Sequence, residues 1–215
     1  MVNIEKYTAI KQQLTETKTT LVAVSKIKPA SDITKMYELG QRDFGENYVQ
    51  ELVEKQAILP QDINWHFIGH LQTNKVKYIA PFVHLIQSVD SEKLLKEIDK
   101  QGAKNKRKIN VLLQVHIAEE QTKFGFDQAS LNALDVAAFA NVHIAGLMGM
   151  ATFTEDKEKV KREFEVLKSA YNKFEKEKNI ALNTLSMGMS DDFELAVNCG
   201  SNMVRIGSLL FGRRS

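Results

Sequence analysis

Cysteine, net charge and long apolar runs are all scarce in this chain of 215 residues. The one cysteine, Cys199, cannot form an internal disulfide, which predicts a reducing, cytoplasmic compartment. Lysine and arginine number 29 against 27 acidic residues, so no bulk field attracts nucleic acid or a membrane surface. No apolar run approaches the roughly 18 residues that a membrane span needs. The opening MVNIEKYTAI lacks the apolar core of a secretory signal, and we expect none.

Linkers and repeats are also missing from the sequence. No long stretch of proline, glycine or serine, no repeat and no low-complexity tract interrupts the chain. A length of 215 residues suits one large α/β domain or two small ones. The missing linker favours a single domain over residues 1–215.

Short apolar segments typical of buried strands alternate with helical patterns along the whole chain. They fall at residues 21–26, 42–45, 64–68, 83–89, 109–117, 142–149, 182–188 and 203–207. This alternation predicts a parallel sheet covered by helices, because each crossover returns over the covered face. Eight such units predict an α/β protein with a single (β/α)8 TIM barrel, and a doubly wound open sheet is the second choice.

The spacing of apolar residues also defines the expected helices. An extra N-terminal helix ends near residue 18, and its apolar face carries Ile4, Tyr7, Ile10 and Leu14. The later helices are expected at about 31–40, 47–59, 91–102, 127–140, 156–178 and 190–199, with a further helical segment from residue 71.

In a barrel of this kind the functional groups lie where strands end and turn into helices. Those positions are 25–26, 45–47, 66–70, 87–90, the loop around Lys123, 148–150, 186–190 and 205–208. Amide, hydroxyl, glycine and basic groups dominate them, and carboxylates are few. This balance predicts an anionic ligand that is held by hydrogen-bond donors.

Two of these segments have the form of a phosphate site. GMGMSDD places Gly188 and Ser190 at an expected helix start, where backbone N–H groups face outward. RIGSLLFG places Gly207 and Ser208 just after the eighth strand, and barrels often bind phosphate between the loops after strands seven and eight. The two aspartates of GMGMSDD argue against this site, since they also favour a helix start and would repel a phosphate.

The segment LVAVSKIKP ends an apolar strand with Lys26. A lysine that is shielded in a barrel mouth and lies near other cations is more often neutral and nucleophilic, so Lys26 is a candidate to hold an aldehyde. The simpler alternative is a strand-end lysine that reaches solvent. Spacing alone does not choose Lys26 over Lys28, because both point to the same side.

Other reactive residues have simpler interpretations. His66 and His70 bracket a strand end instead of sharing a helix, so no metal site is expected. The run KNKRK at 104–108 has no interleaved aromatic residues and is expected to be a solvated loop. Cys199 is expected to pack in the core. The methionines of MGMATF and SMGMS, among them Met189, suit a pocket lining as well as they suit plain core.

Six motifs in collinear order resemble the pyridoxal phosphate homeostasis family, known as YggS-type proteins. They are LVAVSKIKP, GQRDFGENYVQE, WHFIGHLQTNK, GLMGMA, LSMGMSDDFELAV and MVRIGSLLFG, and the match runs from the opening helix to the final FGRR. That family is similar in fold to the barrel domain of bacterial alanine racemase. The resemblance implies pyridoxal 5′-phosphate as the cofactor.

The resemblance also implies how the cofactor is held. Lys26, the first lysine of the SKIKP segment, would carry it as an internal aldimine. Ser190 of the GMS turn would hold the phosphate together with Gly207 and Ser208 of RIGS. Met189 lies in the same GMS turn and is included in the cofactor site.

Further residues are implied around the cofactor ring. Asn47 of GEN would lie beside the cofactor, Arg205 of VRIG would face the pyridine nitrogen, and Lys123 is a further neighbour. The chain departs from the family at Ile27 and at the serine of RIGS, where relatives commonly have threonine. Ile27 is expected to face away from Lys26, and serine keeps the hydroxyl, so neither change argues against the cofactor.

An arginine at the ring nitrogen favours a cofactor carrier over an enzyme. Arginine cannot accept a proton there, so the ring stays neutral and is a weaker electron sink than a pyridinium. Alanine racemase takes its second base from an additional domain, and this sequence ends soon after its eighth unit, with all five tyrosines in helical stretches. We therefore expect a protein without clear catalytic activity that buffers pyridoxal phosphate and passes it to apo-enzymes.

Several other functions stay open at this stage. A pyridoxal-phosphate-dependent racemase or related amino-acid enzyme is the main alternative, and an aldolase for a phosphorylated aldehyde is more distant. A nucleic-acid or protein adaptor has only the run at 104–108 behind it. A monomer is expected, because no helix is apolar on both sides.

Overall fold

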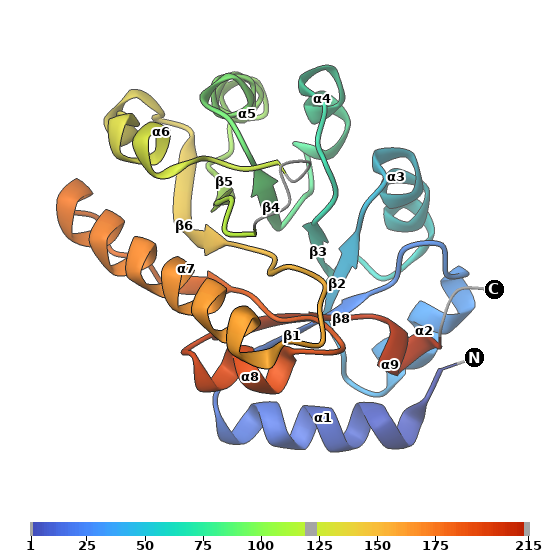
Figure 1. The fold of residues 1–215 in the computed structure, drawn as a ribbon. Helices are drawn as coiled ribbons and strands as arrows, with labels where there is room; N and C mark the ends of the chain where they lie inside the picture. The colour runs from blue at the N-terminus through green and yellow to red at the C-terminus, as the bar shows by residue number, and fades with distance from the viewer. Residues whose placement is uncertain (1, 119–123, 213–215) are drawn as a thin grey trace.

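The strands of the computed structural model, which describes residues 2–118 and 124–212, close into one barrel (Figure 1). The strands are β1 (Thr20–Val24), β2 (Asp43–Glu46), β3 (Asn64–Phe67), β4 (Leu85–Val89), β5 (Ile109–Gln114), β6 (Val142–Met148), β7 (Thr184–Ser186) and β8 (Met203–Ile206). Every strand is parallel to the next, and β8 pairs back onto β1. The predicted (β/α)8 barrel is confirmed, and the open sheet is wrong.

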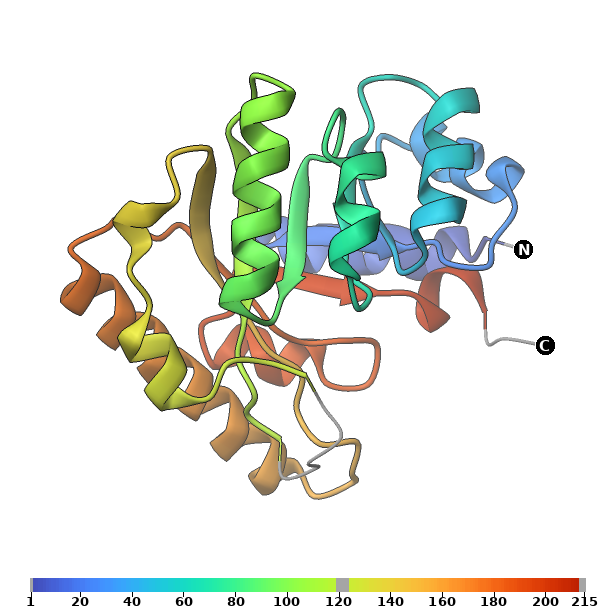
Figure 2. The same cartoon turned by 90° about the horizontal axis from the view of Figure 1, so that it is seen from above.

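Helices surround this barrel. They are α1 (Ile4–Glu16), α2 (Ala30–Glu38), α3 (Val49–Ile58), α4 (Val76–Ile79), α5 (Glu92–Lys104), α6 (Gln128–Ala133), α7 (Lys157–Lys178), α8 (Phe193–Asn198) and α9 (Ser208–Phe211), with 3-10 turns η1 (Thr73–Lys75) and η2 (Val136–Ala138). Seen from above, α3, α4 and α5 stand side by side on one side of the barrel (Figure 2). Within the described residues, none of these helices combines the length and apolar character needed to cross a membrane.

Two apolar layers stabilise the barrel, because its strands are buried on both faces. The inner layer is built by Val22, Leu85, Leu112, Ala145, Met148 and Met203. The much larger outer layer lies between the strands and the apolar faces of the helices. At the carboxyl ends of the strands, polar side chains lie inside the barrel in place of this apolar layer, and they form the site described below.

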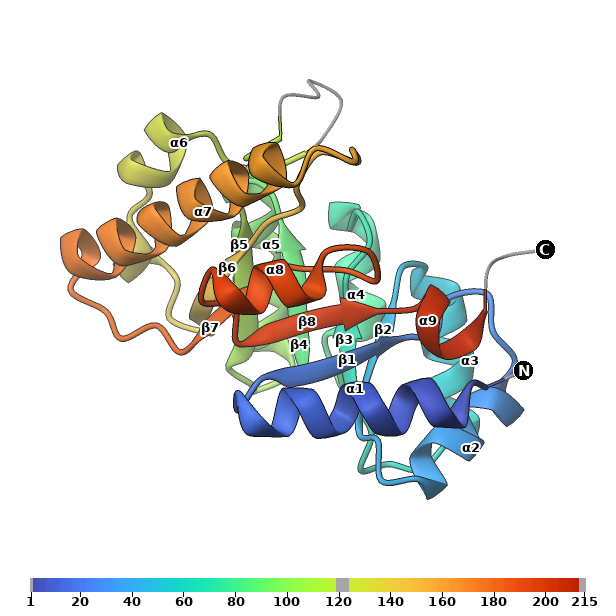
Figure 3. The same ribbon diagram turned by 60° about the horizontal axis from the view of Figure 1, so that its bottom comes forward.

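The extra N-terminal helix α1 runs alongside β1 and β8 on the outside of the barrel (Figure 3). Its buried face carries Tyr7, Ile10 and Leu14, as the spacing predicts, but Ile4, the first residue of the predicted face, is 54% exposed. The Asn3 side chain accepts a hydrogen bond from the Lys6 amide at 3.0 Å and so caps the helix. The backbone amide of Asn3 donates to the carbonyl of Leu210 at 2.8 Å, which joins α1 to α9.

Three predicted helix boundaries are wrong. The helix expected at 127–140 is broken into α6 and η2, because Asp135 bonds the Ala137 amide at 3.1 Å and begins a new turn. The segment expected from residue 71 becomes helical only at η1. The helix expected at 190–199 begins at Phe193, since Asp192 bonds the Met189 amide at 2.6 Å and closes a turn before the helix.

Candidate functional site

A cavity of about 470 Å³ opens at the carboxyl ends of the strands. Its lining includes all the residues predicted from the sequence to bind a cofactor: Lys26, Asn47, Met189, Ser190, Arg205, Gly207 and Ser208. They come from the turns after β1, β2 and β7 and from β8 with the turn that follows it. The closed barrel brings together Lys26 and Ser208, which lie 182 positions apart in the sequence, while the binding role of these residues stays a prediction.

Lys26 lies in a tight turn directly after β1. The Lys28 amide donates to the carbonyl of Ser25 at 3.0 Å, and Ile27 between them has a left-handed φ of 61°. A β-branched residue is strained in that region, and such strain is common at functional sites. Lys28 also reaches the cavity, but its Nζ donates to the carbonyl of Phe211 at 2.9 Å. This contact with the end of α9 distinguishes Lys28 from Lys26, which the spacing of the two lysines in the sequence does not do.

A buried ionic cluster holds this turn from below. Glu46 Oε1 accepts hydrogen bonds from Ser25 Oγ at 2.6 Å and from Lys55 Nζ at 2.8 Å. Lys55 also donates to the carbonyl of Ser25 at 2.8 Å and to Glu51 at 2.6 Å, and Glu51 accepts from the amide of Ile27 at 2.6 Å. Three side chains thus fix the backbone on both sides of Lys26.

The sequence analysis missed this cluster. Glu46 belongs to the GEN motif at the end of β2, and Glu51 and Lys55 have the spacing of an i, i+4 helical pair, so both signals were present. Burial raises the pKa of Glu46 from its usual 4.5 to about 7, and the opposing effects of Lys55 and Ser25 only partly offset it. Glu46 Oε2 is buried without a hydrogen-bond partner in the described part of the chain.

Arg205 points from β8 into the upper end of the barrel and is only 4% exposed. Its guanidinium donates to Ser186 Oγ at 2.6 Å and to the carbonyl of Gly149 at 3.0 Å. Burial lowers the pKa of Arg205 to about 10, against the opposing charge of Asp192, so the group remains a cation at neutral pH. Both acceptor oxygens are uncharged, so neither neutralises the guanidinium of Arg205, which lines the cavity as a cation.

A chain of hydrogen bonds fixes Arg205 from beneath. Ser186 Oγ donates to Gln87 Oε1 at 2.7 Å, Gln87 Nε2 lies 3.0 Å from His66 Nδ1, and His66 Nε2 lies 3.0 Å from Asp43. An amide nitrogen can only donate, so His66 Nδ1 accepts and its Nε2 carries the proton toward Asp43. The barrel interior thus contains one polar line from Arg205 to the opposite end.

The two turns with the form of a phosphate site lie next to each other in the wall of the cavity. The amide of Gly207 donates to Ser190 Oγ at 3.4 Å, and Gly207 is the residue before α9. Gly188 has a left-handed φ of 97°, which permits the sharp turn before Ser190. Of the two aspartates that argue against a phosphate, Asp192 turns its carboxylate back to the amide of Met189, whereas Asp191 lines the cavity.

Asn47 enters the cavity from the turn after β2. Its Oδ1 is buried and has no hydrogen-bond partner among the described residues. A Cβ at Gly69 would lie 2.2 Å from the carbonyl oxygen of Asn47, so only glycine permits this approach. Asn47 also lines a smaller space of about 210 Å³ with His70 and Phe124, whose rings stack at 4.1 Å. Lys123, the other predicted ring neighbour, lies outside the described residues.

Comparison with known proteins assigns the chain to a family. The model for the alanine racemase N-terminal domain matches residues 4–215. The sequence is 42% identical over 197 residues to the pyridoxal phosphate homeostasis protein of Aquifex aeolicus, covering 90% of this chain and 86% of that protein. It is 39% identical over 201 residues to the protein of that name from Escherichia coli K12, covering 91% and 86%. The chain belongs to the pyridoxal phosphate homeostasis protein family.

Solved structures extend this result. PipY of Synechococcus elongatus is 35% identical and covers 97% of this chain and 99% of its own, with a TM-score of 0.92 without pyridoxal phosphate and 0.90 with it bound. Alanine racemase of Bartonella henselae is 16% identical with a TM-score of 0.72, and the chain covers 59% of its length. This second likeness shows that the homeostasis family shares the racemase barrel fold.

The other reactive residues have structural roles or lie away from the cavity. Tyr48, the tyrosine nearest to a strand end, precedes α3 and is 54% exposed. Arg107 of the basic run donates to the carbonyls of Ala80 at 2.6 Å and Val83 at 3.0 Å, so that run is more than a solvated loop. Cys199 is half-buried and packs against the outer core, as expected.

Proposed function

We propose that this protein binds pyridoxal 5′-phosphate in the 470 Å³ cavity, with Lys26 as the covalent anchor, and takes part in intracellular pyridoxal phosphate homeostasis and delivery. The observation that carries the proposal is that Lys26, Arg205 and both phosphate-type turns line one cavity. The family relatives named as pyridoxal phosphate homeostasis proteins and PipY with pyridoxal phosphate bound support the same conclusion.

The donor set of the cavity fits this cofactor. Ser190, Ser208 and the start of α9 at Gly207 supply hydroxyl and backbone donors for a phosphate. Arg205 supplies a buried cation whose N–H groups suit the lone pair of a pyridine nitrogen. The unpartnered Oδ1 of Asn47 needs a donor from a ligand, which the ring hydroxyl of the cofactor would supply.

Lys26 would hold the cofactor covalently in this proposal. Its side-chain amine would bond reversibly to the aldehyde of pyridoxal phosphate with loss of water, which needs no oxidant or further reactant. Glu46 and Lys55 act beneath it by fixing the carbonyl and hydroxyl of Ser25, which sets the position of the Lys26 backbone.

A holding role agrees with the remaining groups of the cavity. Among the described lining residues, Lys28 and Asp191 are the titratable groups besides Lys26 and Arg205. Lys28 Nζ is bonded to Phe211, and Asp191 is exposed at the rim, so neither is positioned as a dedicated second base. Arg205 cannot accept a proton from the ring, which keeps the ring a weak electron sink. Racemase activity is therefore disfavoured.

One titration with a turnover assay tests the proposal. Purified protein is titrated with pyridoxal phosphate, and the absorption band of the imine is followed with and without added L-alanine and D-alanine. We expect stoichiometric binding, with negligible conversion between the two enantiomers, and transfer of the cofactor to an added apo-enzyme. Absence of the band overturns the binding proposal, while robust racemisation by purified protein overturns the carrier proposal alone.

We also propose that residues 1–215 act as one domain, as a monomer, in the cytoplasm. One closed barrel over the described residues supports the single domain. Light scattering during size-exclusion chromatography tests the monomer directly. A mass twice the 24.3 kDa of the chain would contradict it.

A further inference from the structure

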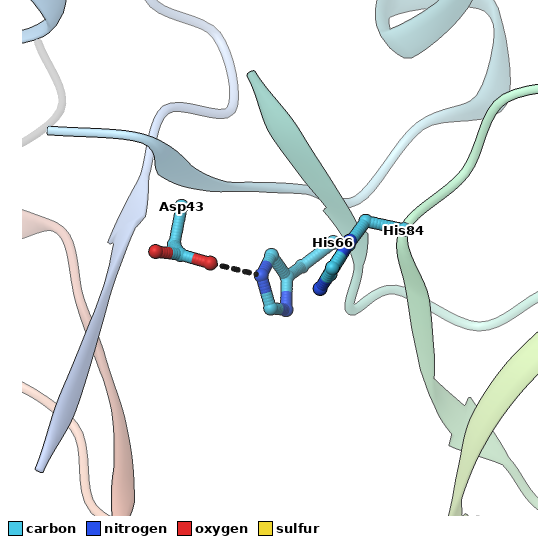
Figure 4. A group of neighbouring side chains, drawn as sticks. All are labelled: Asp43, His66 and His84. Carbon is cyan, nitrogen blue, oxygen red and sulfur yellow. Dashed lines mark hydrogen bonds and ion pairs between the residues drawn. The ribbon is translucent and has the colours of Figure 1, made fainter. Parts of the chain in front are cut away.

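A second cluster of chemically reactive side chains lies at the end of the barrel opposite the cofactor cavity. Asp43 is the first residue of β2, His66 lies in β3, and His84 directly precedes β4. These three strands are neighbours in the barrel, so their side chains converge (Figure 4). The proposed function does not use this cluster, and the sequence analysis compared His66 with His70 instead of with His84.

The donor atoms of the cluster are close enough for one ion. One ligand atom from each residue lies within 4.8 Å of the other two. His66 Nε2 is 3.0 Å from Asp43 Oδ1, and the rings of His66 and His84 have centroids 5.5 Å apart. Zinc bonds to nitrogen and oxygen are about 2.0–2.2 Å long, so two ligands of one ion lie roughly 3–4 Å apart. The 4.8 Å limit lies just above this range, and His84 is the exposed member of the cluster, so its ring is the one that would move to close the gap.

We propose that Asp43, His66 and His84 form a binding site for a divalent transition metal ion of the zinc type. Two imidazoles and a carboxylate suit zinc and its neighbours in the first transition row, whereas calcium and magnesium prefer oxygen ligands throughout. His84 is exposed and Asp43 half-buried, so the ion has an open path and a water completes its four ligands.

A simple structural ion pair explains less of the cluster. The contact between Asp43 and His66 would satisfy both groups without a third member. It gives no reason for the ring of His84 to lie beside that of His66, with ring centroids 5.5 Å apart. A bound cation uses all three side chains.

The second nitrogen of His66 gains the partner that a metal ligand needs if the side-chain amide of Gln87 turns over. Metal-bound histidines usually donate their other N–H to an oxygen. His66 Nδ1 now faces Gln87 Nε2 at 3.0 Å, and turning the Gln87 amide presents its Oε1 to the ring instead. The turned Nε2 then faces Ser186 Oγ, which has a lone pair to accept it.

Metal titration of the full chain tests the site. We expect one equivalent of Zn²⁺ to bind in calorimetry, and Co²⁺ to give the visible absorption of a tetrahedral ion with nitrogen and oxygen ligands. His84→Ala should weaken Zn²⁺ binding at least tenfold, and Asp43→Asn should have a similar effect. His84 is exposed, so His84→Ala is expected to fold normally, which far-ultraviolet circular dichroism checks.

The control is His143→Ala. His143 is a half-buried histidine whose Nδ1 lies 3.0 Å from Asn110 and which has no part in the cluster, so Zn²⁺ binding should be unchanged. The titrations are repeated with pyridoxal phosphate bound, and the dependence on His84 should be the same. No Zn²⁺ binding, or binding that survives in folded His84→Ala, overturns the metal site and leaves the proposed function untouched.

Discussion

At the scale of single residues, the chain places two buried charges around its proposed anchor, and they act differently. Glu46 is a carboxylate whose burial outweighs its ion pair, whereas Arg205 keeps its charge because its pKa stays near 10. One group fixes the Lys26 turn, and the other faces the cavity. Each leads to a measurable prediction.

Glu46→Gln should change how stability depends on pH. The pKa of Glu46 is raised from 4.5 to about 7, so its contribution to stability is fully present below pH 4.5 and is lost as the pH rises through about 7. Glutamine stays neutral, so the variant should gain stability relative to the wild type between pH 5 and pH 8, by at most about 3 kcal/mol. Urea unfolding across this range measures it.

The control for this prediction is Glu16→Gln. Glu16 is an exposed carboxylate at the end of α1, and its replacement should leave the pH profile of unfolding unchanged. A constant difference in unfolding free energy between Glu46→Gln and the wild type at all pH values would show that folding does not shift the pKa of Glu46, and it would contradict this prediction.

Arg205→Lys should weaken pyridoxal phosphate binding although it keeps the positive charge. Lysine cannot bridge Ser186 Oγ and the carbonyl of Gly149 while also facing the cavity, as the planar guanidinium does. Loss of one charge-assisted hydrogen bond predicts roughly a tenfold rise in Kd. Fluorescence titration measures this change, and an unaltered Kd would remove Arg205 from the site.

At the scale of elements, the sequence predicted the barrel well because its strands and most helices have clear patterns. The long α7 was expected to within a residue or two, since its buried residues recur at helical steps. The helix expected at 190–199 was placed too early, because the side chain of Asp192 bonds the Met189 amide and no periodicity reveals such a turn. Patterns therefore locate elements, while side-chain caps decide where they begin.

Only those residues of the candidate site that stand in recognisable motifs could be predicted from the sequence. Lys26 and Arg205 stand at strand ends in recognisable motifs, so they could be named from the sequence. Lys55 could not, because it reaches Ser25, 30 positions away in the chain, only after α3 packs against β2 and β3. His84 was missed in the same way, since only the barrel brings it next to His66.

The turn after β1 predicts an unusual tolerance of glycine. Ile27 has a φ of 61° and is 61% exposed, so Ile27→Gly relieves strain and loses little packing. Left-handed strain of about 1–2 kcal/mol offsets the backbone entropy of glycine, so thermal unfolding should show equal or higher stability. In contrast Val166→Gly, at an exposed position within α7, should lose roughly 0.5 kcal/mol.

The prediction for Ile27 depends on whether Ile27→Gly raises or lowers the stability of the protein. A clear loss of stability in Ile27→Gly would mean that the isoleucine side chain contributes packing that exceeds the strain. The Val166 variant guards against a general effect of glycine, because both positions are exposed and both residues are β-branched.

At the scale of the whole molecule, a ligand that binds only the closed barrel must stabilise all of it. The cavity is lined by residues of β1 and β8 and by the segments that follow β1, β2, β3, β6, β7 and β8, so a bound cofactor contacts parts of the chain that are far apart in the sequence. Pyridoxal phosphate at about 100 times its Kd should add about 2.7 kcal/mol, which raises Tm by roughly 5–10 °C. Differential scanning calorimetry measures the Tm with and without the cofactor. In Lys26→Ala, addition of pyridoxal phosphate should leave the Tm unchanged.

The most direct test of the central claim is to map the covalent anchor. Protein loaded with pyridoxal phosphate is reduced with borohydride and digested, and the modified peptide is sequenced by mass spectrometry. The structure predicts one modified residue, Lys26, in the wild type and in Lys28→Ala, and no modification in Lys26→Ala. A modified Lys28, or full modification of Lys26→Ala at another lysine, would contradict the account.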